Sequence, residues 1–253
     1  MYFVVTIKDR NDPVFCIEGN LMRKYDVAYI LKQNVKPDEM RYSLRSIEEN
    51  LNHGKVFFYC GKPDGIEPDV YVQHVQTGAT KWERARSSLI KICENKDMTK
   101  KFWLFNDDFY ILAPMTSEKP LHRGLIKDHY LDVEKRHGGM ITAYTRQLRN
   151  CEDMLKSAGC TTLDYALHVP MLIDRAKMLE ALQMFPRCPM FRSLYGNYAS
   201  IGGEFIKDNK ILTPGRILDP DARFLSSSDK TFNESVREFL EERFPDPCRY
   251  ETN

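Results

Sequence analysis

Short apolar runs and helix-like patterns alternate along the first part of the chain. Residues 26–32 and 53–60 are compact apolar runs, which is typical of buried strands. Between them, Pro37 opens a segment with Asp38 and Glu39 in its first turn, a favourable start for a helix. Its apolar positions then recur at helical spacing: Met40, Leu44, Ile47 and Leu51.

A second round of the same alternation follows. Residues 68–75 form a third apolar run, and residues 78–95 predict a helix with one apolar face. The stretch Lys101–Leu112, KFWLFNDDFYIL, predicts a fourth strand. Strands and helices that alternate in this order favour an α/β sheet covered by helices.

The second half of the chain is less regular. Residues 137–159 predict a loop and a helix that ends at Gly159, and residues 165–174 predict a strand. A short amphipathic helix follows over residues 175–185, and a last helix ends at Pro245. We expect Ser226–Asp229 to supply the N-cap of that last helix. The whole pattern predicts one α/β domain over residues 1–253 with helical C-terminal additions.

Composition narrows the class of protein but not its activity. The chain has 253 residues, of which 42% are hydrophobic and 29% charged, and a net charge of +1. This charge gives no argument for nucleic acid or membrane binding. No apolar run reaches the roughly 18 residues of a membrane span, and the N-terminus does not resemble a signal peptide. Seven cysteines without a CxxC spacing indicate free thiols in a reducing cytoplasm.

The predicted fourth strand is interrupted by Asn106, Asp107 and Asp108. Two adjacent carboxylates are costly to bury without a partner. They could form a tight polar turn, because Asn and Asp are common turn residues. They could also hold Mg²⁺ or Mn²⁺, which prefer carboxylate ligands together with substrate phosphates. In α/β sheets ligands bind outside the carboxyl ends of the strands, where these residues are expected.

Three further residues are candidates for the same site. Arg41 and Arg45 lie on one face of a predicted helix and could bind phosphate, although a solvated helix face is an alternative. His168 follows an apolar run and could act as a general base, or it could be a hydrogen-bonded core histidine. No GxSxG, GxxxxGK[ST], HExxH or GxGxxG motif points to another chemistry.

Four segments, in this order, resemble the sequence blocks of the Stealth family of sugar-phosphate transferases. This family includes bacterial capsule enzymes and the lysosomal-enzyme GlcNAc-1-phosphotransferase. The segments are DVAYILK (26–32), DEMRYSLRSIEEN (38–50), KFWLFNDDFYIL (101–112) and HVPMLI (168–173). The first block departs from the family, because LKQN stands where Trp-Val-Asp-Gly normally follows the strand.

The resemblance implies a GT-A-like, Rossmann-like mixed sheet flanked by helices. It implies that Asp107 and Asp108 hold a metal and the diphosphate, with Asn106 beside them. It also makes His168 a catalytic residue and Arg192 a phosphate ligand. The compact length of the chain is similar to that of transferases from bacteria and their viruses. We expect a nucleotide-binding half over residues 1–115 and an acceptor-side half over residues 116–253.

Together these observations predict a metal-dependent nucleotide-sugar transferase in the cytoplasm of a bacterial or infected host cell. With Mn²⁺ or Mg²⁺, it would move a hexose or hexose-1-phosphate from a nucleotide diphosphate sugar to an acceptor hydroxyl. Asp108 and His168 would be catalytic, and the acceptor would be a glycan, a protein or DNA. The alternatives are a DNA-base-modifying glycosyltransferase and a non-catalytic nucleotide- or glycan-binding module.

Overall fold

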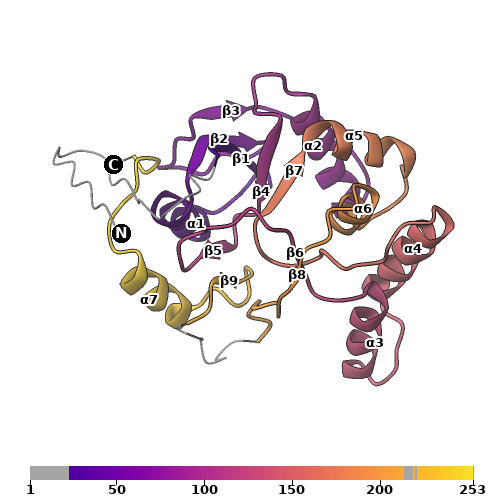
Figure 1. Ribbon diagram of the computed structural model, residues 1–253. Helices are drawn as coiled ribbons and strands as arrows, with labels where there is room; N and C mark the ends of the chain where they lie inside the picture. Colours follow the sequence, from indigo (N-terminus) through magenta and orange to yellow (C-terminus); the bar gives the residue numbers. More distant parts are fainter. Residues whose placement is uncertain (1–22, 214–218, 220, 253) are drawn as a thin grey trace, which may run out of the picture.

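A computed structural model describes residues 23–213, 219 and 221–252. The fold is built around one mixed β-sheet (Figure 1). The expectations for the N-terminal segment and for Cys16 lie outside these residues. The central sheet has the order β3-β2-β1-β4-β7. Its strands are β1 (Tyr25–Ile30), β2 (His53–Tyr59), β3 (Val70–Val72), β4 (Lys101–Phe105) and β7 (Met171–Asp174).

The sheet is parallel except at one edge. β1 pairs in parallel with β2 and with β4, β2 pairs in parallel with β3, and β7 is antiparallel to β4. The parallel strands carry few polar residues, because helices cover both faces of the sheet. The structure therefore confirms the predicted α/β class, a mixed sheet flanked by helices.

The two faces of the sheet build two hydrophobic cores. Alternate residues of β4 show the division, since Phe102 and Leu104 point to one core and Trp103 and Phe105 to the other. Helix α1 (Pro37–Asn50) packs its apolar face, including Leu44, against the second core. Helices α2 (Lys81–Glu94), α5 (Arg175–Met184) and α6 (Phe191–Tyr198) contribute to the first.

The other described elements are two small sheets and further helices. Two small sheets join segments that are distant in sequence: β5 (Phe109–Ile111) with β9 (Phe224–Ser226), and β6 (Leu121–His122) with β8 (Glu204–Phe205). Helices α3 (Ile126–Arg136) and α4 (Ala143–Ser157) pack on each other and project from the body in Figure 1. Helix α7 (Glu234–Arg243) closes a third core against β5 and β9.

Several details differ from the sequence-based expectations. Lys101–Leu112 is not one strand, because a turn at Asn106–Asp108 separates β4 from β5, which belongs to another sheet. Ser226–Asp229 is not the N-cap of α7. The side chain of Asn233 caps that helix by accepting from the backbone N–H of Val236. Helices α3 and α6 were not predicted from the pattern.

Two other properties follow from the described residues. Six cysteines outside the N-terminal segment are free thiols: Cys60, Cys93, Cys151, Cys160, Cys188 and Cys248. Among the helices of the described part, none combines the length and apolar character that crossing a bilayer requires. The division into a nucleotide-binding half and an acceptor-side half stays a prediction, although β7 of the second half completes the sheet of the first.

Candidate functional site

The candidate site lies where the direction of the strand connections reverses. From β1 the chain moves outward through β2 to β3, and it then returns to the other side of β1 to form β4. Tyr29 of β1 is paired with Phe105 of β4, so residues 30–32 and 106–108 leave the sheet side by side. Ligands of open α/β sheets bind outside the carboxyl ends of the strands at such a reversal.

Glycine makes close packing possible at this edge. Gly61 follows β2, and a Cβ atom at this position would overlap the carbonyl oxygen of Lys32. Only glycine lets the two chain segments approach so closely. The backbone that carries Lys32 is therefore held against the end of β2, beside the turn that follows β4.

The Asn106–Asp108 stretch is a turn that also presents carboxylates. The backbone N–H of Phe109 donates to the carbonyl oxygen of Asn106 at 3.3 Å, which closes the turn. Burial raises the pKa of Asp107 to about 6, the neighbouring charge of Asp108 adds to this, and Lys32 opposes it. Asn106–Asp108 can therefore form a tight turn and also bind a ligand, because the turn places the carboxylates of Asp107 and Asp108 beyond the end of β4.

Asp108 is held from the distant C-terminal part of the chain. Its Oδ2 atom lies 3.2 Å from Nζ of Lys210, and its backbone oxygen accepts from the N–H of Ser227 at 3.3 Å. Its other carboxylate oxygen, Oδ1, is buried and has no hydrogen-bond partner within the described chain. A buried unpaired carboxylate oxygen is costly, so Asp108 has one oxygen available for a ligand.

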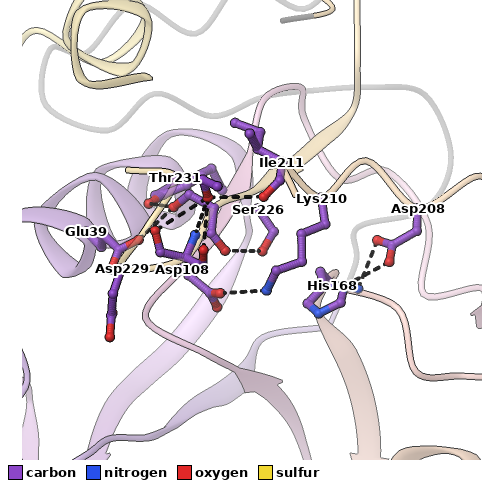
Figure 2. Close-up of polar contacts among 12 residues, drawn as sticks. Glu39, Asp108, His168, Asp208, Lys210, Ile211, Ser226, Asp229 and Thr231 are labelled. Carbon is purple, nitrogen blue, oxygen red and sulfur yellow. Dashed lines mark hydrogen bonds and ion pairs between the residues drawn. The ribbon is translucent and has the colours of Figure 1, made fainter. Parts of the chain in front are cut away.

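A second group of charges lies next to the two aspartates. Glu39 accepts a hydrogen bond from Oγ of Ser227 at 2.7 Å. Burial raises the pKa of Glu39 to about 7, and the negative charges of Asp107 and Asp229 act in the same direction. Lys32 offsets part of this charge, because its Nζ lies 3.0 Å from Oδ2 of Asp229. The site is acidic with two lysines at its border, and Figure 2 shows several of these groups together.

His168 forms a pair with a carboxylate that sequence reasoning did not identify. Its Nδ1 atom lies 2.8 Å from Oδ2 of Asp208, and its backbone N–H donates to Oδ1 of the same residue at 3.2 Å. Burial disfavours the Asp208 carboxylate, but the hydrogen bonds from His168 and the charge of Arg123 hold its pKa below the usual value. Asp208 thereby fixes the imidazole orientation and keeps Nδ1 as the donor.

The imidazole of His168 is close to the acidic turn. Its ring meets the edge of the Phe109 ring at a centroid distance of 6.1 Å, and Phe109 directly follows Asp108. In the view of Figure 2, the side chain of Lys210 lies between Asp108 and the His168–Asp208 pair. The structure therefore brings His168 into contact with Phe109, the residue that directly follows Asp108.

Arg192 also approaches this cluster. Its guanidinium group lies over the Phe109 ring, 5.5 Å from the centroid, and donates to the carbonyl oxygen of Val169. Burial lowers the pKa of Arg192 to about 10, while the charges of Asp208 and Asp108 partly offset that effect. Its position fits a charged site residue, and its role in phosphate binding stays a prediction.

Arg41 and Arg45 make their contacts elsewhere. Nε and Nη2 of Arg45 lie 2.6 and 2.8 Å from the two carboxylate oxygens of Glu251, and Nη1 donates to the carbonyl oxygen of Phe244 at 2.8 Å. Nε of Arg41 lies 2.9 Å from the same Glu251 carboxylate. These contacts favour a structural role that ties α1 to the C-terminal segment. The phosphate-binding role of both arginines, and that of the exposed Asn106, stays a prediction.

Sequence reasoning missed most of the charged groups around the two aspartates. Asp208 and Lys210 lie in an irregular segment, IKDNKIL, with no periodicity that marks a site. Lys32 belongs to LKQN, the place where the chain departs from the Stealth pattern, and that departure was the available signal. Glu39 was assigned only to the first turn of a helix.

The residues at the turn can accommodate a metal that is shared with a substrate. No preformed group of three or more His, Cys, Asp or Glu ligands occurs in the described part of the chain. Mg²⁺ is nevertheless commonly held by one or two carboxylates together with substrate phosphates. Asp107 and Asp108 supply two carboxylates, and the unpartnered Oδ1 of Asp108 is a suitable hard ligand.

Comparisons with known proteins give only distant similarity. No family model matches the sequence, and no curated protein matches it. A 4-diphosphocytidyl-2C-methyl-D-erythritol synthase structure matches with a TM-score of 0.40 and 12% identity over 88% of this chain and 100% of that one. The glycosyltransferase GlyE of Streptococcus pneumoniae TIGR4 matches with a TM-score of 0.35 and 12% identity. That alignment covers 87% of this chain and 60% of GlyE. Because both TM-scores are low, these similarities do not identify the function of this chain.

Proposed function

We propose that this protein is a metal-dependent transferase that uses a nucleotide diphosphate sugar as its donor. The observation that carries the proposal is the position of Asp107 and Asp108 at the strand reversal, with the His168–Asp208 pair beside them. The resemblance of these same segments to the Stealth family supports it. The acceptor would be a hydroxyl group of a glycan, a protein or DNA.

The donor would bind across the carboxyl ends of β1 and β4. Asp107 and Asp108 would hold Mn²⁺ or Mg²⁺ on the diphosphate, and Lys32 and Lys210 would lie close enough to contact phosphate oxygens. When bound, the metal would neutralise the charge that develops on the leaving phosphate. The two lysines would add positive charge at the border of the same site.

The acceptor would be activated on the His168 side of the site. Because Nδ1 of His168 faces Asp208, Nε2 is the nitrogen that can accept a proton from the acceptor hydroxyl. In hexose transfer, the acceptor oxygen bonds to the anomeric carbon while the bond from that carbon to the diphosphate oxygen breaks. In sugar-phosphate transfer, the acceptor oxygen bonds to the β-phosphorus while the bond from that phosphorus to the oxygen bridging the two phosphates breaks, and a nucleoside monophosphate leaves. In both cases the proton passes to His168.

Product analysis with nucleotide sugars tests the proposal without knowledge of the acceptor. The protein is incubated with a panel of nucleotide sugars, with and without Mn²⁺, and slow transfer to water is followed. A released nucleoside diphosphate indicates hexose transfer, and a monophosphate indicates sugar-phosphate transfer. Release should require metal and should be lost in Asp108→Asn.

Asp153→Asn is the matched control, because Asp153 is an exposed aspartate on α4. It should release product at the rate of the unmodified protein. The proposal fails if no nucleotide sugar is bound in a thermal-shift screen, or if Asp108→Asn releases product as fast as the control.

A further inference from the structure

A small cavity lies beside the candidate site and contains none of its carboxylates. It has a volume of about 40 Å³ and is bordered by the sheet face at β4 and β7 and by the chain around β6 and β9. Its lining includes Trp103, Val169, Leu121, Phe224 and Arg192. Val169 directly follows His168, so the cavity adjoins the part of the site where the acceptor would be activated.

Two side chains that line this cavity each carry a buried N–H donor without an acceptor among the described residues. Trp103 is only 3% exposed, and its indole Nε1 has no partner within the described residues. Nε of Arg192 is likewise buried and unpartnered there. Buried donors are almost always hydrogen-bonded, and each one left unpaired costs about 1–3 kcal/mol. Because both side chains line the same cavity, we infer that an acceptor group is missing there.

The charges around the cavity favour a negatively charged occupant. Arg192 is half-buried and forms no direct ion pair with any described residue, and Arg223 also lines the cavity. The two glutamates of the lining have donors of their own. Glu118 accepts from the Tyr25 hydroxyl at 3.0 Å, and Glu204 pairs with Lys119. The charges of Asp208 and Asp108 offset only part of the cost of burying this guanidinium group, so an anion in the cavity would stabilise it further.

We propose that this cavity binds an oxyanion, a carboxylate or a phosphoryl group, carried by the acceptor substrate. Its volume exceeds that needed for one water molecule by roughly threefold, which suits a group of this size. The assignment to the acceptor rests on the proposed function. It follows from the location, because the cavity adjoins His168 through Val169 and includes neither Asp107 nor Asp108.

The two tryptophans allow a direct test by NMR. The chain contains only Trp82 and Trp103, so an ¹⁵N-labelled sample gives two indole N–H signals. Formate and inorganic phosphate are each titrated through the millimolar range. We expect the Trp103 signal to shift and saturate while the Trp82 signal stays in place. The anion that binds with the higher affinity shows whether the acceptor carries a carboxylate or a phosphoryl group.

Variants show whether the anion is held by Arg192. Arg192→Gln should weaken anion binding at least tenfold, whereas Arg187→Gln, at an exposed arginine, should not change it. If Arg192→Gln does not fold, Arg192→Lys keeps the charge but loses the Nε–H donor and should weaken binding as well. An unshifted Trp103 signal, or equal binding by Arg192→Gln and the control, overturns the proposal.

A competition experiment separates this proposal from the proposed function. The Trp103 titration is repeated with a nucleoside diphosphate and Mn²⁺ present. If the cavity serves the acceptor, the affinity for the anion stays the same. Competition between the diphosphate and the anion would assign the cavity to the donor and overturn the acceptor assignment. A Trp103 shift without any binding of nucleotide would retain the oxyanion site and contradict only the proposed function.

Discussion

Nζ of Lys210 lies 3.2 Å from Oδ2 of Asp108, although the two residues are 102 positions apart. The ammonium group occupies one oxygen of a carboxylate that is proposed to bind metal. Without metal, Lys210 places a positive charge against Asp108, which lies next to Asp107 in the turn. The contact therefore links the irregular segment around Lys210 to the electrostatics of the site.

Replacement of this lysine tests that link. Lys210→Met should lower the melting temperature in EDTA, because Asp108 then loses the ammonium group that faces its carboxylate. Mn²⁺ should then stabilise the variant more than it stabilises the unmodified protein, since a cation replaces the lost charge. The measurement is thermal unfolding with and without Mn²⁺. Equal Mn²⁺-induced shifts in both proteins would contradict this interpretation.

His168 is expected to control turnover rather than donor binding. His168→Ala should lower kcat by about 10²–10⁴-fold, the usual contribution of a positioned base. The affinity for the nucleotide sugar should change little, because the base contacts the acceptor. His137→Ala, at an exposed histidine, is the control.

The same experiment distinguishes a structural histidine from a base. A structural role predicts a lower melting temperature and near-normal turnover in the folded fraction of His168→Ala. Asp208→Asn provides a second comparison, because it leaves the imidazole in place but weakens its orientation. Its kcat should fall between those of His168→Ala and the unmodified protein.

Arg45 is expected to matter for stability. Its side chain is 11% exposed, and it forms a paired contact with both oxygens of Glu251. Arg45→Ala should lower the free energy of unfolding by about 1.5–3 kcal/mol, as for hydrogen bonds to a charged group. If the role of Arg45 is structural, nucleotide affinity should stay the same. Urea unfolding and nucleotide titration measure the two quantities, with the exposed Arg146→Ala as control. A loss of nucleotide affinity at normal stability would instead support the phosphate-binding role.

Glu39 should make stability depend on pH. Burial raises its pKa from 4.5 to about 7 in the folded protein. Between these values the folded chain keeps a proton that the unfolded chain has released. The folded state then binds more protons, so stability falls as the pH rises through this window. Asp107 acts in the same direction, since burial raises its pKa from 3.8 to about 6.

Glu39→Gln tests this pH dependence. The free energy of unfolding is measured in urea at about pH 5 and about pH 8 for both proteins. The unmodified protein should lose more stability over this range than Glu39→Gln, because the variant has no proton to release at this position. Equal losses would show that Glu39 is ionised in the folded protein throughout the range.

Local sequence patterns predicted the elements of the central sheet well. The periodicity after Pro37 gave α1, and the apolar runs gave β1, β2 and β4. These elements depend on the spacing of apolar residues within short segments, which the sequence shows directly. The pattern failed at residues 106–108, because a run that is apolar on both sides does not reveal that its two parts belong to different sheets.

By itself, the sequence determined the α/β class and identified Asp107, Asp108 and His168 as candidates. Only the tertiary structure decided which groups surround them. It placed Lys210 at Asp108, Asp208 at His168, and Glu251 at the two helix arginines. The physical reason is that these contacts join residues far apart in the chain. Their pairing depends on the order of strands and the path of irregular segments, which leave no local periodicity in the sequence.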